Sequence, residues 1–327
     1  MRTMFYLLKN NLNRAISRKN YFLLMLCITV VTIGAAVYFT GKLEVRGNIA
    51  VVGDFQSLAV DSKYLHVEKL AKVPEKSALV MNKYDAVLIE KGGGGFDLMT
   101  IKSPSYKDRI LQILNKGSVE LPDSEKRGIA SNILGYLVMM IFIQGLLFMM
   151  MYADDKENGT FKRIGVSPVP AGTYLAGHGI FNFIMVFVPT YLVIVVCKLI
   201  FNINIGLSFF KYAWLLALIT FLATSYSLLL SSIFKKTESS NMVGQAVAVL
   251  TSLLAGCFYS FDNAHSIMKK LVMVLPQKNF LLLIQGVEQG KSLSGFAPQL
   301  IYLLVLPVVM LIASGILVKS KLKKGEC

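Results

Sequence analysis

The sequence predicts an α-helical integral membrane protein with six transmembrane helices and a small α/β extracellular domain inserted between helices 1 and 2. Of its 327 residues, 54% are hydrophobic and only 16% are charged, and the mean hydropathy is +0.58. Several uninterrupted apolar runs reach about 20 residues, the length that crosses the hydrocarbon core of a bilayer. Basic residues gather beside the ends of these runs, as in multi-pass proteins.

Six apolar runs are long enough to span a membrane. They cover residues 21–40, 131–151, 174–199, 212–234, 241–260 and 299–318. The first follows a basic stretch, as the apolar part of a signal peptide would. Its core is longer than that of a signal peptide, and no small-residue cleavage site follows Thr40. We therefore expect residues 21–40 to be the first transmembrane helix.

Residues 1–20 precede this helix and carry apolar side chains at helical spacing, with basic side chains on the other faces. The apolar set is Met4, Leu7, Leu8, Leu12 and Ile16. This pattern predicts an amphipathic interfacial helix lying along the inner leaflet. A cytoplasmic stub with basic anchors is the alternative.

The basic residues also predict an orientation. They precede the first span and follow the second, fourth and sixth, so the positive-inside rule places both termini in the cytoplasm of a plasma-membrane protein. Residues 41–128 are then extracellular, and their 14 Lys and Arg are balanced by 12 Asp and Glu. This segment contributes +2 and the rest of the chain +13, so most of the net charge of +15 belongs to the membrane part. It indicates orientation and contact with membrane lipids, and not a nucleic-acid partner.

The extracellular segment alternates strand-like and helix-like patterns. Residues 49–52, 86–89 and 98–101 resemble short strands, and residues 109–114 have a helical pattern. The run Gly92 to Gly95 lacks the lysine and hydroxyl residue of a phosphate-binding loop, so it predicts a hairpin turn. The chain has no nucleotide-binding motif.

Catalytic and metal-binding patterns are also missing from the sequence. The three histidines stand alone, no Cys or His pair has metal-ligand spacing, and no pair of Asp, Glu or His residues falls inside a span. We therefore expect no catalytic residue, no bound metal and no cofactor on this chain, which is not an enzyme by itself. Any ATP would be hydrolysed elsewhere.

The most informative stretch is the charged segment at residues 153–173, between the second and third spans. Its marked residues are Lys156, Glu157, Gly159, Thr160, Phe161, Arg163, Ile164, Ser167 and Pro168. With Tyr174, Gly177 and His178, this stretch resembles the cytoplasmic loop of ABC-2 type permeases, the membrane subunits of type V ABC exporters. Residues 241–276, with their small-residue LLAGCFY stretch and terminal proline, resemble the fifth span of that family.

The resemblance implies that residues 153–173 are a coupling loop for a separate ABC ATPase subunit, which would hold ATP and Mg. It also implies a second permease copy or a paralogue as partner. Physically, Lys156, Glu157 and Arg163 would offer charges to the ATPase. Phe161 and Ile164, three residues apart, would fill an apolar groove on it. An ordinary solvated loop is the alternative.

Between the last two spans, residues 262–296 are apolar but too interrupted to cross the membrane. They predict short external re-entrant helices, and the resemblance makes Phe258 and Pro276 candidates for an external gate. Simple surface helices are the alternative. Within the spans, the polar residues Gln144, Asn241 and Gln245 are candidates for the pathway or the dimer interface, or for helix packing.

A methionine-rich second span and the scarcity of polar residues favour a hydrophobic or amphiphilic cargo, such as an antimicrobial compound, a peptide or a lipid. The resulting hypothesis is export of this cargo by a permease subunit. The alternative from another class is a receptor-like membrane module whose external domain binds a ligand.

Overall fold

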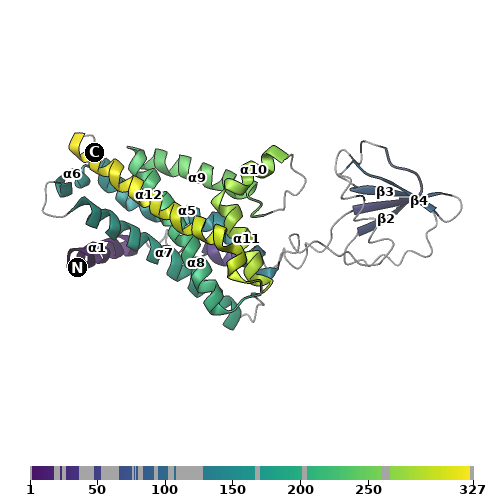
Figure 1. Cartoon of the computed structure of the whole chain (residues 1–327), viewed down its shortest axis with the longest axis horizontal. Helices are drawn as coiled ribbons and strands as arrows, with labels where there is room; N and C mark the ends of the chain where they lie inside the picture. The colour runs from purple at the N-terminus through teal and green to yellow at the C-terminus, as the bar shows by residue number, and fades with distance from the viewer. Residues whose placement is uncertain are drawn as a thin grey trace. The chain divides into compact units, whose positions relative to one another are not determined.

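A computed structural model describes residues 2–17, 23, 27–36, 48–52, 66–75, 77, 79, 84–91, 95–101, 107, 128–165, 170–200, 205–258 and 266–324. The chain divides into two compact units. Residues 1–37 and 127–327 form the first, called the helical unit, and residues 38–126 form the second, called the sheet unit. Figure 1 shows both.

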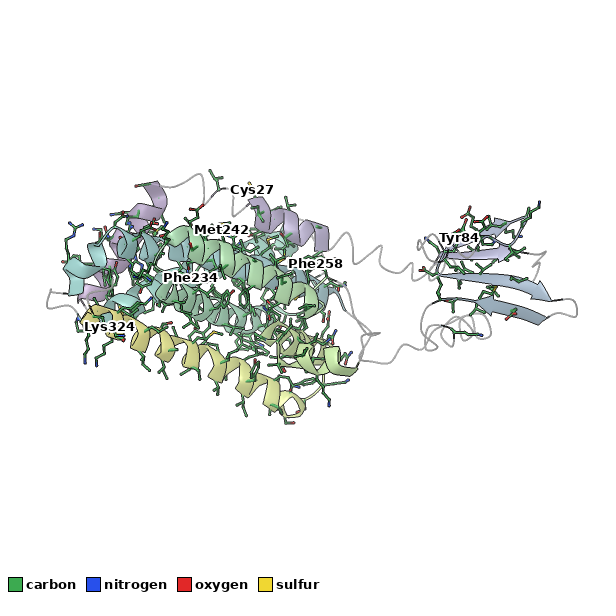
Figure 2. All side chains as sticks on the ribbon, turned by 90° about the horizontal axis from the view of Figure 1, so that it is seen from above. Cys27, Tyr84, Phe234, Met242, Phe258 and Lys324 are labelled. Atoms are coloured by element: carbon green, nitrogen blue, oxygen red, sulfur yellow. The ribbon has the colours of Figure 1, made fainter. Side chains whose placement is uncertain are left out.

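The helical unit is a bundle of long helices with shorter ones at its ends. Its elements are α1 (Arg2–Ser17), a helix at Cys27–Ala36, α5 (Ile129–Glu157), α6 (Thr160–Gly165), α7 (Ala171–Leu199), α8 (Phe209–Ile233), α9 (Thr237–Leu254), α10 (Ser266–Val274), α11 (Pro276–Glu288), the 3₁₀ turn η1 (Leu293–Phe296) and α12 (Ala297–Lys324). One end of the bundle, called the terminal end, holds α1, α6 and the last turn of α12 (Figure 1). Figure 2 shows Lys324 at this end and Phe258 at the opposite end.

Among the residues that the structure describes, four helices are long and apolar enough to cross a membrane: α5, α7, α8 and the helix Leu293–Lys324 that combines η1 with α12. They confirm a membrane-embedded fold and contain four of the six predicted spans. Within the first predicted span the structure describes residue 23 and the short apolar helix Cys27–Ala36. The fifth predicted span ends earlier than expected. There α9 stops at Leu254, and Gly256 turns the chain with a φ of 80°.

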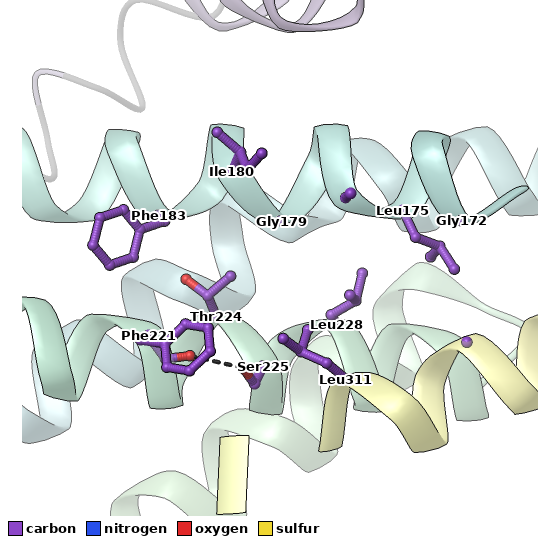
Figure 3. A pocket seen from close by; sticks show the side chains of 12 residues that line it. Gly172, Leu175, Gly179, Ile180, Phe183, Phe221, Thr224, Ser225, Leu228 and Leu311 are labelled. Carbon is purple, nitrogen blue, oxygen red and sulfur yellow. Dashed lines mark hydrogen bonds between the residues drawn. The ribbon is translucent and has the colours of Figure 1, made fainter. Parts of the chain in front are cut away.

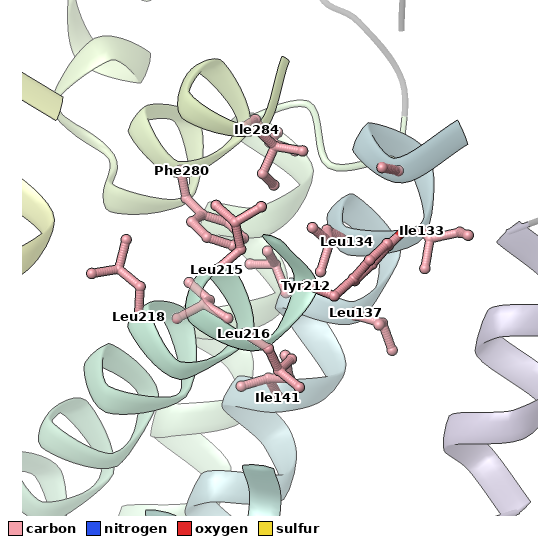
Figure 4. Packing of buried hydrophobic residues seen from close by; sticks show 14 of the residues in the cluster. Ile133, Leu134, Leu137, Ile141, Tyr212, Leu215, Leu216, Leu218, Phe280 and Ile284 are labelled. Atoms are coloured by element: carbon pink, nitrogen blue, oxygen red, sulfur yellow. The ribbon is translucent and has the colours of Figure 1, made fainter. Parts of the chain in front are cut away.

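The main core lies between α5, α8 and α11, where branched and aromatic side chains interlock (Figure 4). Leu134 and Tyr212 are fully buried there beside Phe280. Two small residues let α5 and α8 approach closely, because a Cβ on Gly145 would lie 2.9 Å from the Ser227 Oγ. Small residues at helix contacts are typical of membrane bundles, where van der Waals packing drives association.

The two helices between α9 and α12 are short. α10 has 9 residues and α11 has 13, so each is shorter than a membrane span. Pro276 occupies the first turn of α11, where a missing N–H costs nothing. One face of α11 is buried against the core through Phe280, Leu281 and Ile284. Pro276 thus marks the break between the two helices, whereas Lys269 and Lys270 lie in the middle of α10.

The apolar pattern of α1 serves two surfaces. Leu7 and Leu8 pack against other helices of the helical unit, and Asn11 and Ala15 are buried beside them. Leu12 and Ile16 are exposed, as side chains that lie along the inner leaflet would be. The bundle therefore buries part of the apolar set that the sequence assigned to the membrane surface, together with Asn11, whose partner His178 comes from α7.

The sheet unit contains a four-stranded sheet in the order β2-β1-β3-β4. Its strands are β1 (Asn48–Val52), β2 (His66–Leu70), β3 (Ala86–Lys91) and β4 (Gly95–Met99). β1 is parallel to β2 and to β3, and β3 pairs antiparallel with β4, as the glycine run predicts for a hairpin. Its core includes Ala50, Leu79 and Tyr84 (Figure 2). β2 was not predicted, and the helical pattern at residues 109–114 lies outside the described residues.

Candidate functional site

Three consecutive residues at the end of α5, Asp155, Lys156 and Glu157, contact four other helices. Asp155 binds side chains of α1 and α7, Lys156 binds the end of α8, and Glu157 binds the start of α9. These three residues are called the α5 junction. Because successive residues of a helix point about 100° apart, three neighbours reach three sides of α5.

Asp155 ties α1 and α7 to α5 through one carboxylate oxygen. Its Oδ2 lies 2.9 Å from the Arg14 guanidinium and accepts a hydrogen bond of 2.6 Å from the Tyr174 hydroxyl. The His178 Nε2 lies 3.7 Å away, and the His178 Nδ1 lies 3.3 Å from the Asn11 side-chain amide. The cluster is largely shielded from solvent, where such bonds are stronger than at the surface.

Lys156 is buried, with 5% of its surface exposed. Its ammonium donates hydrogen bonds to the carbonyl oxygens of Ser231 (2.6 Å), Ser232 (3.3 Å) and Phe234. Lys321 of α12 donates to the carbonyls of Ser232 and Ile233 from the other side. The last carbonyls of a helix have no partner within the helix and carry partial negative charge. Two ammonium groups thus cap the C-terminus of α8.

Glu157 makes the opposite kind of contact with α9. Its carboxylate accepts a hydrogen bond of 2.8 Å from the backbone N–H of Thr237, the first residue of α9. The residue preceding α9, Lys236, provides no side-chain cap. Glu157 therefore supplies from α5 the anionic cap that stabilises a helix N-terminus.

After the α5 junction the chain turns sharply into α6. Gly159 has a φ of 68°, in the left-handed region that glycine adopts without strain. The turn places Phe161 of α6 at 1% exposure, with its ring 5.9 Å from that of Tyr152 and 5.5 Å from that of Tyr174. Since Tyr174 also binds Asp155, Tyr174 connects α6 to the α5 junction.

The structure corrects two expectations for the coupling segment. Lys156 and Phe161 were expected to face a partner, but both are used inside the chain, on α8 and on the aromatic side chains. Glu157 and Arg163 are exposed, and Gly159 and Thr160 are half-buried. The side chain of Ile164 and all of Ser167 and Pro168 lie outside the described residues.

The polar residues of the spans pair within the helical unit. The Gln144 amide donates to the Thr29 hydroxyl (2.8 Å) and accepts from the Thr190 hydroxyl (3.5 Å). Asn182 donates to the Gly145 carbonyl (2.6 Å) and accepts from the Thr224 hydroxyl (3.2 Å). Within this chain Gln144 joins neighbouring helices, which favours the helix-packing alternative for this residue.

Asn241 and Gln245 occupy a different position. They lie one turn apart on α9, half-buried, and the Gln245 amide donates to the Asn241 side-chain oxygen (3.2 Å). On the same helix, Met242 is 66% exposed and Leu250 is 59% exposed. α9 therefore carries a surface that is mainly apolar but contains an amide pair.

At the opposite end of the bundle, Glu288 of α11 caps α5. Its carboxylate accepts hydrogen bonds from the backbone N–H groups of Ala130 (2.8 Å) and Ser131 (3.0 Å) and from the Ser131 hydroxyl (2.6 Å). Of the two gate candidates, Phe258 stacks edge-on against Tyr136 of α5 at 4.8 Å, and Pro276 begins α11. Both ends of α5 are thus bound by charged side chains.

Sequence reasoning missed Arg14, Asp155, Lys321 and Glu288. Their only signal in the sequence is a charge next to a predicted helix end, and such charges are usually solvated. Among the residues that the structure describes, no group of three or more His, Cys, Asp and Glu residues is placed to hold a metal ion.

Comparison with known families identifies one match over most of the chain. A family model described as ABC-2 family transporter protein matches residues 72–316, which is more than half of the sequence. The match includes the α5 junction, α6 and both helices at the opposite end. No curated protein matches the sequence.

Proposed function

The chain belongs to the ABC-2 family of transporter proteins, and from this premise we propose that it is the permease subunit of an exporter driven by a separate ATPase. The permease would carry the cargo pathway, and the ATPase would bind ATP and Mg. The observation that carries this proposal is the α5 junction, because one helix end holds contacts to α1, α7, α8 and α9. A displacement of the α5 junction would therefore be transmitted to these four helices.

The ATPase would dock on α6 and the turn before it, at the terminal end. Arg163 and Glu157 are exposed there, and Phe161 anchors α6 from below through a buried ring. A short helix that is rigidly seated, with charges outward, is suited to receive force from a soluble partner. This placement makes the terminal end cytoplasmic, in agreement with the orientation that the positive-inside rule predicts.

Movement of α6 would pass to the bundle through the polar contacts of Asp155 and Lys156, each of which links more than one helix to α5. Asp155 joins α1 to α7, and Lys156 shares the end of α8 with Lys321 of α12. Such contacts break and re-form over small distances, whereas packed helices move as rigid bodies. ATP binding and hydrolysis would thus tilt α9 and α12 relative to α5.

A second permease copy would pack against α9. Its exposed apolar side chains include Met242 and Leu250. These two side chains by themselves could equally face lipid. The half-buried pair Asn241 and Gln245 lies on the same helix, and amide groups at membrane depth are best placed against protein or a water-filled pathway. This combination supports a dimer interface that also borders the pathway.

The cargo would be hydrophobic or amphiphilic, because the second span is rich in methionine and polar residues are scarce in the predicted spans. At the outer end, α10 and α11 would shape the exit, with Glu288 fixing α11 to the start of α5. The residues of the sheet unit would then lie on the extracellular side, between the first two spans.

The docking proposal is tested by complex formation with a candidate ABC ATPase in detergent. Arg163→Glu reverses the exposed charge on α6, and Lys291→Glu makes the same reversal at an exposed residue that follows α11. We expect Arg163→Glu to reduce ATPase retained on the tagged permease, while Lys291→Glu retains as much as the wild type. Equal retention by all three proteins would overturn the docking surface.

A further inference from the structure

An apolar pocket of about 500 Å³ lies between α7, α8 and α12, toward the terminal end (Figure 3). Residues Gly172, Leu175, Ala176, Gly179, Ile180 and Phe183 of α7 form one wall. The others come from α8, which includes Thr224 and Ser225, and from α12 at Leu311 and Gly315. Its volume lies within the range of ligand sites. The pocket is separate from the α5 junction and from the exposed surface of α9.

Glycines create this space. Gly172, Gly179 and Gly315 line the pocket, and a Cβ on any of them would find no atom within 4 Å. None of the three has a positive φ, so no turn requires glycine at these positions. Glycine inside a helix costs about 0.5–1 kcal/mol relative to alanine. Three destabilising glycines that line the same open volume are explained if a ligand fills that volume.

The chemistry of the walls selects an alkyl chain. The only hydroxyl side chains among the lining residues are those of Thr224 and Ser225, and both donors are already used. Thr224 donates to the Asn182 side chain (3.2 Å) and Ser225 to the Phe221 carbonyl (2.8 Å, Figure 3). Apolar cavities of this kind stay dry and bind apolar molecules. Ile180, 39% exposed, lies on the rim, which opens the pocket to the surroundings of these spanning helices.

One end of the pocket lies at a helix start and close along α12 to a basic residue. It reaches Gly172 in the first turn of α7, a helix start that has neither a side-chain cap nor an acidic residue. The N–H groups of such a turn attract anions. On α12, Lys319 is exposed one turn beyond Gly315 and lies on the same side of the helix. Basic residues at a membrane surface contribute about 1 kcal/mol each toward binding anionic lipids.

We propose that this pocket binds one acyl chain of an anionic phospholipid from the surrounding leaflet. The chain lies among the glycines and Leu311, and the phosphate sits between Lys319 and the first turn of α7. The lipid is a resident ligand that wedges α7 against α12. This inference depends on the membrane-embedded fold and does not depend on the identity of the cargo or of the ATPase.

The test measures lipid retained by the full-length chain in detergent, by native mass spectrometry, after exposure to dioleoylphosphatidylglycerol or dioleoylphosphatidylcholine. Gly179→Leu fills the pocket and should not harm the helix, because leucine is a better helix former than glycine. Ile316→Phe adds bulk on an exposed part of α12 that does not line the pocket. Lys319→Gln removes the positive charge proposed to bind the lipid phosphate. A thermal melt of each variant verifies folding.

We expect the wild type and Ile316→Phe to retain one phosphatidylglycerol, and Gly179→Leu to lose it while melting no lower than the wild type. Lys319→Gln should retain lipid but lose the preference for the anionic headgroup. Equal retention by Gly179→Leu and wild type would overturn the site. Equal retention of the two lipids by the wild type would overturn the anionic assignment, and a wild type that retains neither would overturn both.

Discussion

Lys156 and Lys321 place two ammonium groups on the last carbonyls of α8, where the aligned peptide dipoles concentrate negative partial charge. Asp155 and Glu157 carry the opposite charge, and each carboxylate requires hydrogen-bond donors. They find them in the Arg14 guanidinium and in the N–H of Thr237. At this scale the terminal end is held together by charges that satisfy the backbone or side chains of neighbouring helices.

Replacing Lys156 by methionine should destabilise the chain by about 1–3 kcal/mol, because buried carbonyl oxygens of α8 lose their donor. Lys321→Met should cost less, since Lys321 is half-buried and Lys156 still caps Ser232. The two variants are compared by thermal or detergent unfolding in micelles. A larger loss for Lys321→Met would contradict the assigned roles.

The ion pair between Arg14 and Asp155 is tested by a double-mutant cycle with Arg14→Gln and Asp155→Asn. We expect a coupling of about 1 kcal/mol, because the pair is shielded on the carboxylate side but part-exposed on the guanidinium side. The matched cycle pairs Asp155→Asn with Lys9→Gln, an exposed residue of α1. Coupling of similar size in both cycles would indicate a general charge effect and no specific bond.

At the scale of elements, short connections control how helices meet. Gly159 turns the chain between α5 and α6, and at the other end of α5 the N-terminus approaches α11 closely. An ideal Cβ on Gly128 would lie 2.1 Å from the Glu288 carboxyl carbon. Gly159 thus allows a left-handed turn, and Gly128 leaves room for the Glu288 side chain that caps α5.

Gly159→Ala should cost about 1–2 kcal/mol, because alanine is strained at a φ of 68°. The control is Gly34→Ala, where a Cβ meets open space and φ is not positive. We expect Gly159→Ala to lower the melting temperature and Gly34→Ala to leave it unchanged or raise it. Equal melting temperatures for Gly159→Ala and the wild type would contradict the required turn geometry.

Gly128→Ala should displace the Glu288 side chain and uncap α5, so its cost should match that of Glu288→Ala. Because both changes remove the same cap, the double variant should cost little more than either alone. Unfolding measurements on the three variants decide this. Fully additive losses would show that Gly128 acts on stability by another route.

At the scale of the whole helical unit, α5 connects its two ends. The α5 junction binds α1, α7, α8 and α9 at the terminal end, and Glu288 of α11 binds the start of the same helix at the opposite end. Force received at α6 could therefore reach the short helices α10 and α11 through a single rigid element. This arrangement fits a permease in which docking and exit lie on opposite sides of the membrane.

The sequence predicted the long spans well and the α5 junction poorly, for physical reasons. Apolar length is a local property, so the runs at 131–151, 174–199 and 299–318 fall within described helices, and the run at 212–234 ends one residue beyond α8. The direction of a side chain such as Lys156 depends on where α8 ends in space, which no local pattern contains. A charged residue next to a span is usually exposed to solvent, and only the three-dimensional structure shows that Lys156 is buried as a cap of α8.

We propose that α5 passes the action of an ATPase to the rest of the bundle. This coupling is tested by ATP hydrolysis in nanodiscs by a cognate ATPase bound to the permease, comparing the wild type with Glu157→Ala and with Glu238→Ala, a change at an exposed acidic residue of α9. We predict that Glu157→Ala loses the hydrolysis that the permease stimulates, while Glu238→Ala keeps it. Stimulated hydrolysis at the wild-type rate in Glu157→Ala would contradict coupling through the α5 junction.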